Sequence, residues 1–339
     1  MVDTIKVSIC IPVYNGEKFL KKTIESILNQ SYKNFEFLIV DNASTDKTPE
    51  IIQSFKDPRI RYYRNPKIIS GQQNWSLCVE LAHGDIVAIY HADDLYHPDI
   101  VKKQVQFFAD HKDVGAVFTE ATKIDAHDKK IGTIELPKTL KGKSIFAFKD
   151  IFIQLIKNNY NPLVCPSFMV RKDIFKRVGH FNFEDYTNIY DIDMYLRILE
   201  ISNIGVINEK LINYRIHPMQ GSVLFSTKIC DHNEIYDMYD KLIVKYPTLL
   251  SKSDLARYDC FKKWDYTSHA IRALLRDDVV LAKNLLKKSF SVTRFFTSLT
   301  DINLFVRLLV SVFFLPITYL GLGHFFAKLL FKYKLGYIT

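Results

Sequence analysis

The chain has 339 residues, of which 48% are hydrophobic, and a formal net charge of +9. This length and apolar content exclude a disordered chain and allow one large α/β domain with an appended region. The five cysteines are widely spaced and form no Cys-X-X-Cys pair, which argues against a disulfide framework or a zinc site and favours a reducing compartment. The N-terminus lacks the features of a signal peptide, so we expect a protein that is not secreted.

The first 120 residues or so alternate apolar strand candidates with amphipathic helix candidates. The pattern predicts strands at 7–13, 35–40, 60–63, 86–90 and 114–118, and helices near 18–29, 49–56, 73–82 and from Pro98 onward. This alternation predicts an α/β fold with a mostly parallel, Rossmann-like sheet flanked by helices. A sheet of this kind binds ligands beyond the carboxyl ends of its strands.

The second half of the chain is less regular. A polar stretch at 122–142 predicts a hairpin or an excursion from the sheet. The segments that follow are a helical pattern at 145–157, an apolar segment at 166–170, a helix candidate at 192–201, a strand-like segment at 211–216, and helices near 234–245, 255–275 and 279–288. The chain therefore ends in a helical extension.

Carboxylates stand at the ends of two predicted strands. Asp41 ends one strand, and Asp93 and Asp94 follow another about fifty residues later. Carboxylates at this edge of a sheet indicate a nucleotide held with a hard divalent cation, which prefers oxygen ligands. The alternatives are an Asx turn or a helix cap at Asp41, and a solvated turn in which Asp94 caps the next helix.

The C-terminal segment is both basic and apolar. Residues 283–339 hold eight Lys or Arg against one acid, and residues 308–323 carry no charge. Sixteen residues with Pro316 in the middle fall short of the roughly 20 that span a bilayer, so we expect an interfacial or re-entrant helix pair at a membrane surface. The basic residues that flank this stretch are Arg307, Lys328, Lys332 and Lys334. There are two alternatives. The helix could extend through residues 324–327 and span the bilayer, or the segment could form a buried helical pair in a soluble fold.

Five segments carry a resemblance to a known family. They are Val7 to Asn15, Leu38 to Asp46, Gly84 to Asp94, Tyr190 to Arg197 and Tyr214 to Pro218. In order and spacing, from about residue 6 to about 222, the chain resembles the family 2 inverting glycosyltransferases of the GT-A fold. The resemblance implies transfer of a sugar from a nucleoside diphosphate sugar, with a lean towards UDP, to a hydroxyl of a lipid-linked or cell-surface glycan precursor. It also implies a divalent cation, Mn²⁺ or Mg²⁺.

The resemblance assigns residues to the donor site. Nucleotide contacts are expected from Pro12, Tyr14, Asn15, Asp41, Arg64, Asn74 and Asp93, with Gln73 standing where many relatives have arginine. Asp93 is the expected metal ligand, and His217 contacts metal or phosphate unless it is a satisfied structural group. His91 occupies the first position of the family's Asp-any-Asp sequence, a departure that leaves His91 and Asp94 in supporting roles.

An inverting transfer also needs a carboxylate that takes the acceptor's proton from the side opposite the metal. The family places Glu-Asp before a helix for this purpose, and here Tyr190-Asp191 occupies that place. We therefore predict Asp191 as the base, unless it only caps the helix. Asp193 is expected to support the site or to pair with Arg197 at i,i+4.

These expectations divide the chain into a GT-A domain at 1–222, a helical extension at 223–300 and an apolar, basic, membrane-associating tail at 301–339. The predicted location is the cytoplasm, peripheral on the inner face of the cell membrane.

Two other functions stay open: transfer to a polyprenyl phosphate, whose oxygen needs no base, and sugar-nucleotide binding without catalysis, suggested by His91. A dehydrogenase is disfavoured because no Gly-X-Gly-X-X-Gly follows the first strand. Nucleic-acid binding is disfavoured because the positive charge coincides with the apolar tail.

Overall fold

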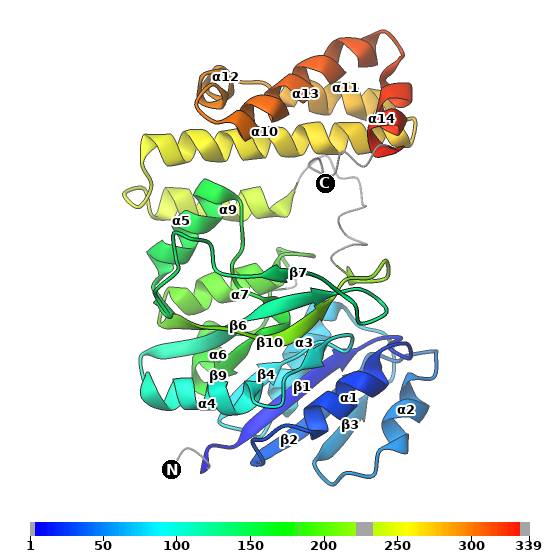
Figure 1. Ribbon diagram of the computed structural model, residues 1–339, viewed down its shortest axis with the longest axis vertical. Coiled ribbons are helices and arrows are strands. Elements are labelled where there is room, and N and C mark those ends of the chain that lie inside the picture. The colour runs from blue at the N-terminus through cyan, green and yellow to red at the C-terminus, as the bar shows by residue number, and fades with distance from the viewer. Residues whose placement is uncertain (1–3, 183, 222–232, 333–339) are drawn as a thin grey trace. The chain divides into compact units, whose positions relative to one another are not determined.

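A computed structural model describes residues 4–182, 184–221 and 233–332, so Lys334 of the predicted tail lies outside the described residues. The chain forms two compact units (Figure 1). The first, the sheet unit, comprises residues 1–151 and 161–218. The second, the helical unit, comprises residues 152–160 and 219–339, so the predicted helical extension and tail share one unit.

The sheet unit carries all the strands that the structure describes. They are β1 (Val7–Val13), β2 (Phe35–Asp41), β3 (Ile60–Arg64), β4 (Ile86–Ile89), β5 (Leu95–Tyr96), β6 (Val114–Ile124), β7 (Lys130–Ile134), β8 (Ile145–Phe146), β9 (Met169–Arg171) and β10 (Asn203–Arg215). Its helices are α1 (Leu20–Leu28), α2 (Thr48–Ser54), α3 (Gly71–Leu81), α4 (Ile100–Asp110), α6 (Lys172–Val178) and α7 (Tyr190–Leu199). Helix α5 (Phe148–Asn158) crosses the division between the units.

The strands form one mixed sheet in the order β3-β2-β1-β4-β9-β6-β10-β5. The first four are parallel, as the alternation predicts, so their carboxyl ends share an edge. Strand β9 then separates β4 from β6 and runs antiparallel to both. Met169 and Val170 of β9 are fully buried, and because consecutive side chains of a strand point to opposite faces, both faces of the sheet are covered at this inner strand.

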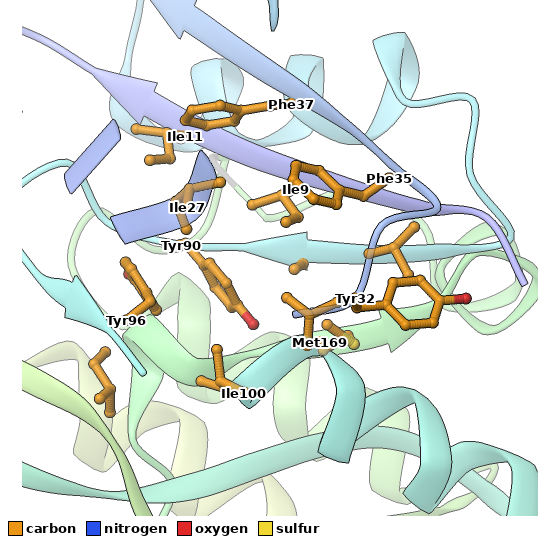
Figure 2. Packing of buried hydrophobic residues seen from close by; sticks show 14 of the residues in the cluster. Ile9, Ile11, Ile27, Tyr32, Phe35, Phe37, Tyr90, Tyr96, Ile100 and Met169 are labelled. Carbon is orange, nitrogen blue, oxygen red and sulfur yellow. The ribbon is translucent and has the colours of Figure 1, made fainter. Parts of the chain in front are cut away.

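The core of this unit fixes the edge where the loops emerge. Strand β2 is buried along its whole length, which explains the apolar run from Phe37 to Val40. Figure 2 shows Ile9 and Ile11 of β1, Phe37 of β2 and Ile27 of α1 in one buried cluster. Packing on both faces of the central strands holds their ends in place, so a side chain that follows such a strand starts from a fixed position.

The helical unit contains six described helices besides the end of α5. They are α9 (Glu234–Lys245), α10 (Lys252–Leu275), α11 (Val279–Lys288), α12 (Val292–Ser298), α13 (Ile302–Tyr319) and α14 (Gly323–Lys332). Ser251 and Asp254 form a capping box that starts α10, the longest helix. A buried cluster that includes Leu274, Leu285 and Phe314 joins α10, α11 and α13.

Candidate active site

The ends of β1 and β2 carry the first group of predicted nucleotide contacts. Asp41 ends β2 and is fully buried; its Oδ1 accepts from the Ser44 amide at 2.8 Å, and its Oδ2 accepts from the Tyr62 hydroxyl at 2.8 Å. Burial raises the pKa of Tyr62, and the hydrogen bond to Asp41 raises it further, so the phenol stays a donor. The Asx-type bond to Ser44 agrees with the turn alternative, and the predicted nucleotide contact of Asp41 stays a prediction.

Two loops meet beyond these strand ends. Asn15, which follows Pro12 and Tyr14, adopts a left-handed backbone at φ 51°. Its amide donates to Ser44 Oγ at 2.9 Å, and its Oδ1 accepts from the Thr45 amide at 2.8 Å. The Tyr14 ring is exposed by 49%, so it offers an aromatic face where a base can stack.

Arg64 and Asn74 differ in how the protein uses them. Arg64 donates from Nη2 to the Ser44 carbonyl at 2.7 Å, and its Nε lies 3.7 Å from Asp41 Oδ2, so it lies at the predicted nucleotide loops. Asn74 is buried, donates to the Val40 carbonyl at 3.1 Å and accepts from Asn65 at 2.9 Å. Its amide therefore ties α3 to β2, and a contact with nucleotide stays a prediction.

The end of β4 leads into a cluster of possible metal ligands. Candidate ligand atoms of His91, Asp93 and Asp94 all lie within 4.8 Å of one another. Oδ2 of Asp93 also lies 2.9 Å from Nε2 of His217. Burial alone raises the pKa of Asp93, but the hydrogen bond with His217 lowers it and the overall shift is downward, which favours the carboxylate form.

Asp94 is not a helix cap, so that alternative is wrong. Helix α4 starts after Asp99, whereas Oδ1 of fully buried Asp94 accepts from the Arg215 amide at 2.7 Å. Its Oδ2 is buried and has no hydrogen-bond partner among the described residues. Burial and then the charge of Asp93 raise the pKa of Asp94 well above its ordinary value. A bound cation would give this buried oxygen a partner, so the cluster of His91, Asp93 and Asp94 fits a metal site.

Arg215 holds the turn that carries these ligands. Its side chain is fully buried, and its Nε donates to the Asp93 carbonyl at 2.7 Å. Its Nη1 donates to Asp128 at 2.5 Å, and its guanidinium lies over the Phe19 ring at 4.6 Å. Through these contacts β10 fixes the backbone of the turn at Asp93 and Asp94.

The ring of His91 contacts Cys165 and Trp75. Its Nε2 lies 3.6 Å from Sγ of Cys165, and its ring meets the edge of Trp75 with 5.2 Å between centroids. Burial lowers the pKa of His91, against the charge of Asp93, which favours a neutral imidazole with a lone pair. His91 thus offers a nitrogen where the family has a carboxylate.

Asp191 lies in the first turn of α7, next to Cys165. Its Oδ1 accepts from the Ile192 amide at 2.8 Å, and it shares a hydrogen bond with the Cys165 thiol. Burial raises the pKa of Asp191, while these two donors lower it, and the overall shift is upward. The centroid of the Trp75 ring lies 5.3 Å from that of Tyr190, so Trp75 and Cys165 connect the turn at His91 with the start of α7.

Asp193 and Arg197 form the predicted i,i+4 pair, with 2.8 Å between Arg197 Nη2 and Asp193 Oδ2. Arg197 also donates to the His180 carbonyl at 2.9 Å. The pair therefore braces α7 against the segment before it, as a support behind Asp191.

Sequence reasoning gave no role to Trp75, Cys165 or Arg215. Arg215 stood within a recognised segment, next but one to His217, which was a usable signal. Trp75 and Cys165 lie in no such segment, and only the fold brings them together.

Comparison with known proteins agrees with this geometry. Residues 8–179 match the description "Glycosyl transferase family 2". The chain belongs to this family. A relative named as an uncharacterized glycosyltransferase of Methanocaldococcus jannaschii is 31% identical over 220 residues, covering 63% of this chain and 72% of the relative. A second uncharacterized glycosyltransferase, from Rickettsia typhi, is 26% identical over 281 residues, which cover 80% of this chain and 85% of the relative.

Among solved structures, residues 1–349 of Staphylococcus aureus TarS, in complex with UDP-GlcNAc, superpose with a TM-score of 0.60. The two chains are 15% identical, and the match covers 93% of this chain and 90% of that one. This likeness shows a shared fold. The GT-A architecture predicted from the sequence is therefore confirmed, and the protein is a family 2 glycosyltransferase.

Proposed function

We propose that this glycosyltransferase transfers a sugar, with inversion, from a UDP-sugar to an acceptor hydroxyl in a metal-dependent single displacement. The observation that carries the proposal is the pairing of two half-sites by Trp75 and Cys165. One half holds His91, Asp93 and Asp94, and the other holds Asp191. The Cys165 thiol contacts both His91 and Asp191, and Trp75 contacts His91 and Tyr190, the neighbour of Asp191, which supports a donor site and a base that act at one carbon.

The donor half supports nucleotide diphosphate binding. Asp93 and His217 would hold a divalent cation, with Asp94 Oδ2 as a further oxygen ligand. Such a cation, Mn²⁺ or Mg²⁺, supplies positive charge that stabilises the diphosphate as the leaving group. Tyr14 would stack on the base, and Asp41 and Arg64 would contact the nucleoside. The choice of UDP is supported by the fold shared with a protein that was solved with UDP-GlcNAc.

Asp191 would take the proton from the acceptor hydroxyl. As the proton reaches its carboxylate, the acceptor oxygen bonds to the anomeric carbon, and the bond from that carbon to the diphosphate breaks. A base with a raised pKa holds this proton better than an exposed aspartate, so burial of Asp191 suits the role. The acceptor class we propose is a lipid-linked or cell-surface glycan precursor at the cytoplasmic face of a membrane, which is supported by the apolar, basic C-terminal helices.

Calorimetric titration of the purified protein with UDP, GDP and dTDP, each with Mn²⁺ or with EDTA, tests the donor half. We expect UDP to bind with Mn²⁺ and to bind at least tenfold more weakly with EDTA or in Asp93→Ala. Asp173→Ala, which removes an exposed aspartate of α6, is the matched control and should bind UDP as the unaltered protein does. No metal-dependent binding of any nucleotide would refute the proposed donor site.

A further inference from the structure

Helix α13 is apolar on the side that faces away from its own unit. Ile302 and Val306 are exposed by 72% and 50%, and Leu309 and Phe313 are exposed as well. Their spacing of four, three and four residues puts them in one stripe along the helix. The two helices that neighbour α13 also expose large apolar side chains, Phe296 on α12 and Phe325 on α14. We call these six residues the outer stripe. Soluble proteins rarely expose a row of large apolar side chains along a helix without an occupant.

The opposite side of α13 is fixed within the helical unit. Ser311 shares a 2.7 Å hydrogen bond with the Thr267 hydroxyl of α10, and it accepts from Arg294 Nη2 at 2.8 Å. Arg294 is 1% exposed, and its other described acceptors are the carbonyls of Ser289 and Arg307. If α13 left the unit, the buried guanidinium would lose two of its three partners, which is costly for a charged group.

By length and composition α13 qualifies as a membrane-crossing helix, with 18 residues from Ile302 to Tyr319. Its polar contacts with α10 and α12 argue against that use, since a crossing helix would take Ser311 away from Thr267 and Arg294. Only one side of α13 is available to lipid. This geometry is that of a helix that lies along a membrane surface.

The segment that carries the outer stripe is basic. From Val279 to Lys332 the sequence holds seven Lys or Arg and one acid, Asp301, which caps α13 and pairs with Arg257. Lys283 and Lys287 of α11 lie over the ring of Tyr319, at 4.7 and 6.0 Å from its centroid. A half-exposed tyrosine with lysines beside an apolar surface is the composition of a membrane interface.

We propose that the outer stripe docks on an anionic lipid bilayer, with α13 lying in the interface and Lys283 and Lys287 contacting the headgroups. This goes beyond the proposed reaction, since docking requires no catalysis. The charge favours a bilayer over a second copy of the chain, because pairing two copies through this surface would bring two strongly basic regions together. The docking surface includes α11 and α12, which precede the tail predicted at 301–339.

Sedimentation of the full-length protein with phosphatidylglycerol-containing vesicles, and with pure phosphatidylcholine vesicles, tests the proposal. We expect binding to the anionic vesicles that weakens with salt and is reversed by alkaline carbonate, as for a helix that does not cross. Val306→Asp combined with Phe313→Asp should weaken binding at least tenfold. Val244→Asp is the matched control, since Val244 of α9 is 80% exposed and lies outside the outer stripe.

The lysines are tested separately from the apolar residues. Lys283→Gln with Lys287→Gln should weaken binding to anionic vesicles about 25-fold at low salt, or about fivefold for each charge. Lys252→Gln, at the exposed start of α10, should change it little. Circular dichroism and the melting temperature check that each variant folds. No binding to anionic vesicles, equal binding by the stripe variant, or a lipid-free dimer that Val306→Asp dissociates would each overturn the proposal, as would resistance to carbonate.

Discussion

The backbone amide of Arg215 donates a 2.7 Å hydrogen bond to Oδ1 of Asp94, across 121 positions of the sequence. The side chain of the same arginine reaches the carbonyl of Asp93. Strand β10 therefore determines where the turn at Asp93 and Asp94, which carries the proposed metal ligands, lies, although Arg215 itself is buried. Metal affinity and fold stability should then depend on one residue that need not contact the metal.

Replacement of this arginine by methionine, Arg215→Met, should lower the free energy of unfolding by about 3 kcal/mol, because it removes a buried guanidinium and leaves the carbonyls of Asp93 and Asp125 without their donor. Mn²⁺-dependent UDP binding should weaken by about tenfold or more. Urea denaturation and calorimetry measure the two effects. Lys103→Met removes an exposed pair with Glu209 and should cost less than about 1 kcal/mol. Equal losses of stability and of UDP affinity in the two variants would show that Arg215 does not position the turn at Asp93 and Asp94.

The variant Asp191→Asn should keep its affinity for UDP and lose turnover by a factor of about 10² to 10⁴, since the amide cannot take the acceptor's proton. Release of UDP in the presence of acceptor is the measurement. Asp193→Asn loses the ion pair with Arg197 and should lose stability with a smaller effect on turnover. Unchanged turnover in Asp191→Asn would refute its assignment as the base.

Turnover should fall as pH falls through the pKa of Asp191, because only the carboxylate form accepts a proton. Burial raises this pKa above its ordinary value of 3.8, and the Cys165 thiol lowers it again by donating a hydrogen bond. Cys165→Ala removes that donor, so the acidic limb of the kcat profile should move to higher pH. Cys165→Ser retains a donor and should stay near the unaltered profile. Identical pH profiles of kcat for all three proteins would show that the hydrogen bond from Cys165 does not shift the pKa of Asp191.

Glu36 should make stability depend on pH. Burial alone raises its pKa, but donors at Ser8, the His83 amide and Arg61 outweigh burial and lower the pKa below 4.5. A lowered carboxylate pKa adds stability above the unfolded value, and this stability is lost as pH falls through the folded pKa. Glu36→Gln should therefore cost about 2 kcal/mol at pH 7 and much less near pH 3, measured by urea denaturation. Glu25→Gln, at an exposed position of α1, should show no such pH dependence.

The parallel half of the fold was predictable because three of its four strands, β1, β2 and β4, are buried on both faces. The strand expected at 7–13 is β1 without change, and the strand expected at 35–40 ends one residue later, at Asp41. The place of β9 was not predictable from its sequence, since three residues carry too little pattern to indicate a neighbour or a direction. The strand expected at 211–216 begins at Asn203 in the structure, because β10 continues through register shifts along β6.

For the site, the sequence predicted the turn at Asp93 and Asp94 and the start of α7 at Asp191, since each follows or begins a recognisable element; the metal and base roles of these residues stay predictions. It could not locate Cys165, because a short turn before β9 reaches His91 only once β9 lies beside β4. It also could not show that the Asn74 amide is engaged with β2. Contacts set by the order of the strands require the fold, whereas contacts within a segment can be predicted from sequence spacing.

The two units interleave along the chain, because residues 152–160 belong to the helical unit while residues 161–218 return to the sheet unit. A truncation after Pro218 would therefore retain a fragment of the helical unit, including the buried side chains of Phe152 and Ile156, without the remainder of that unit. No single cut yields either unit alone and complete. The chain passes from the sheet unit to the helical unit after residue 151 and returns after residue 160, so gene fusions, domain exchanges and limited proteolysis of this enzyme should be designed around these two points. A shortened, soluble catalytic fragment would need an internal replacement of residues 152–160.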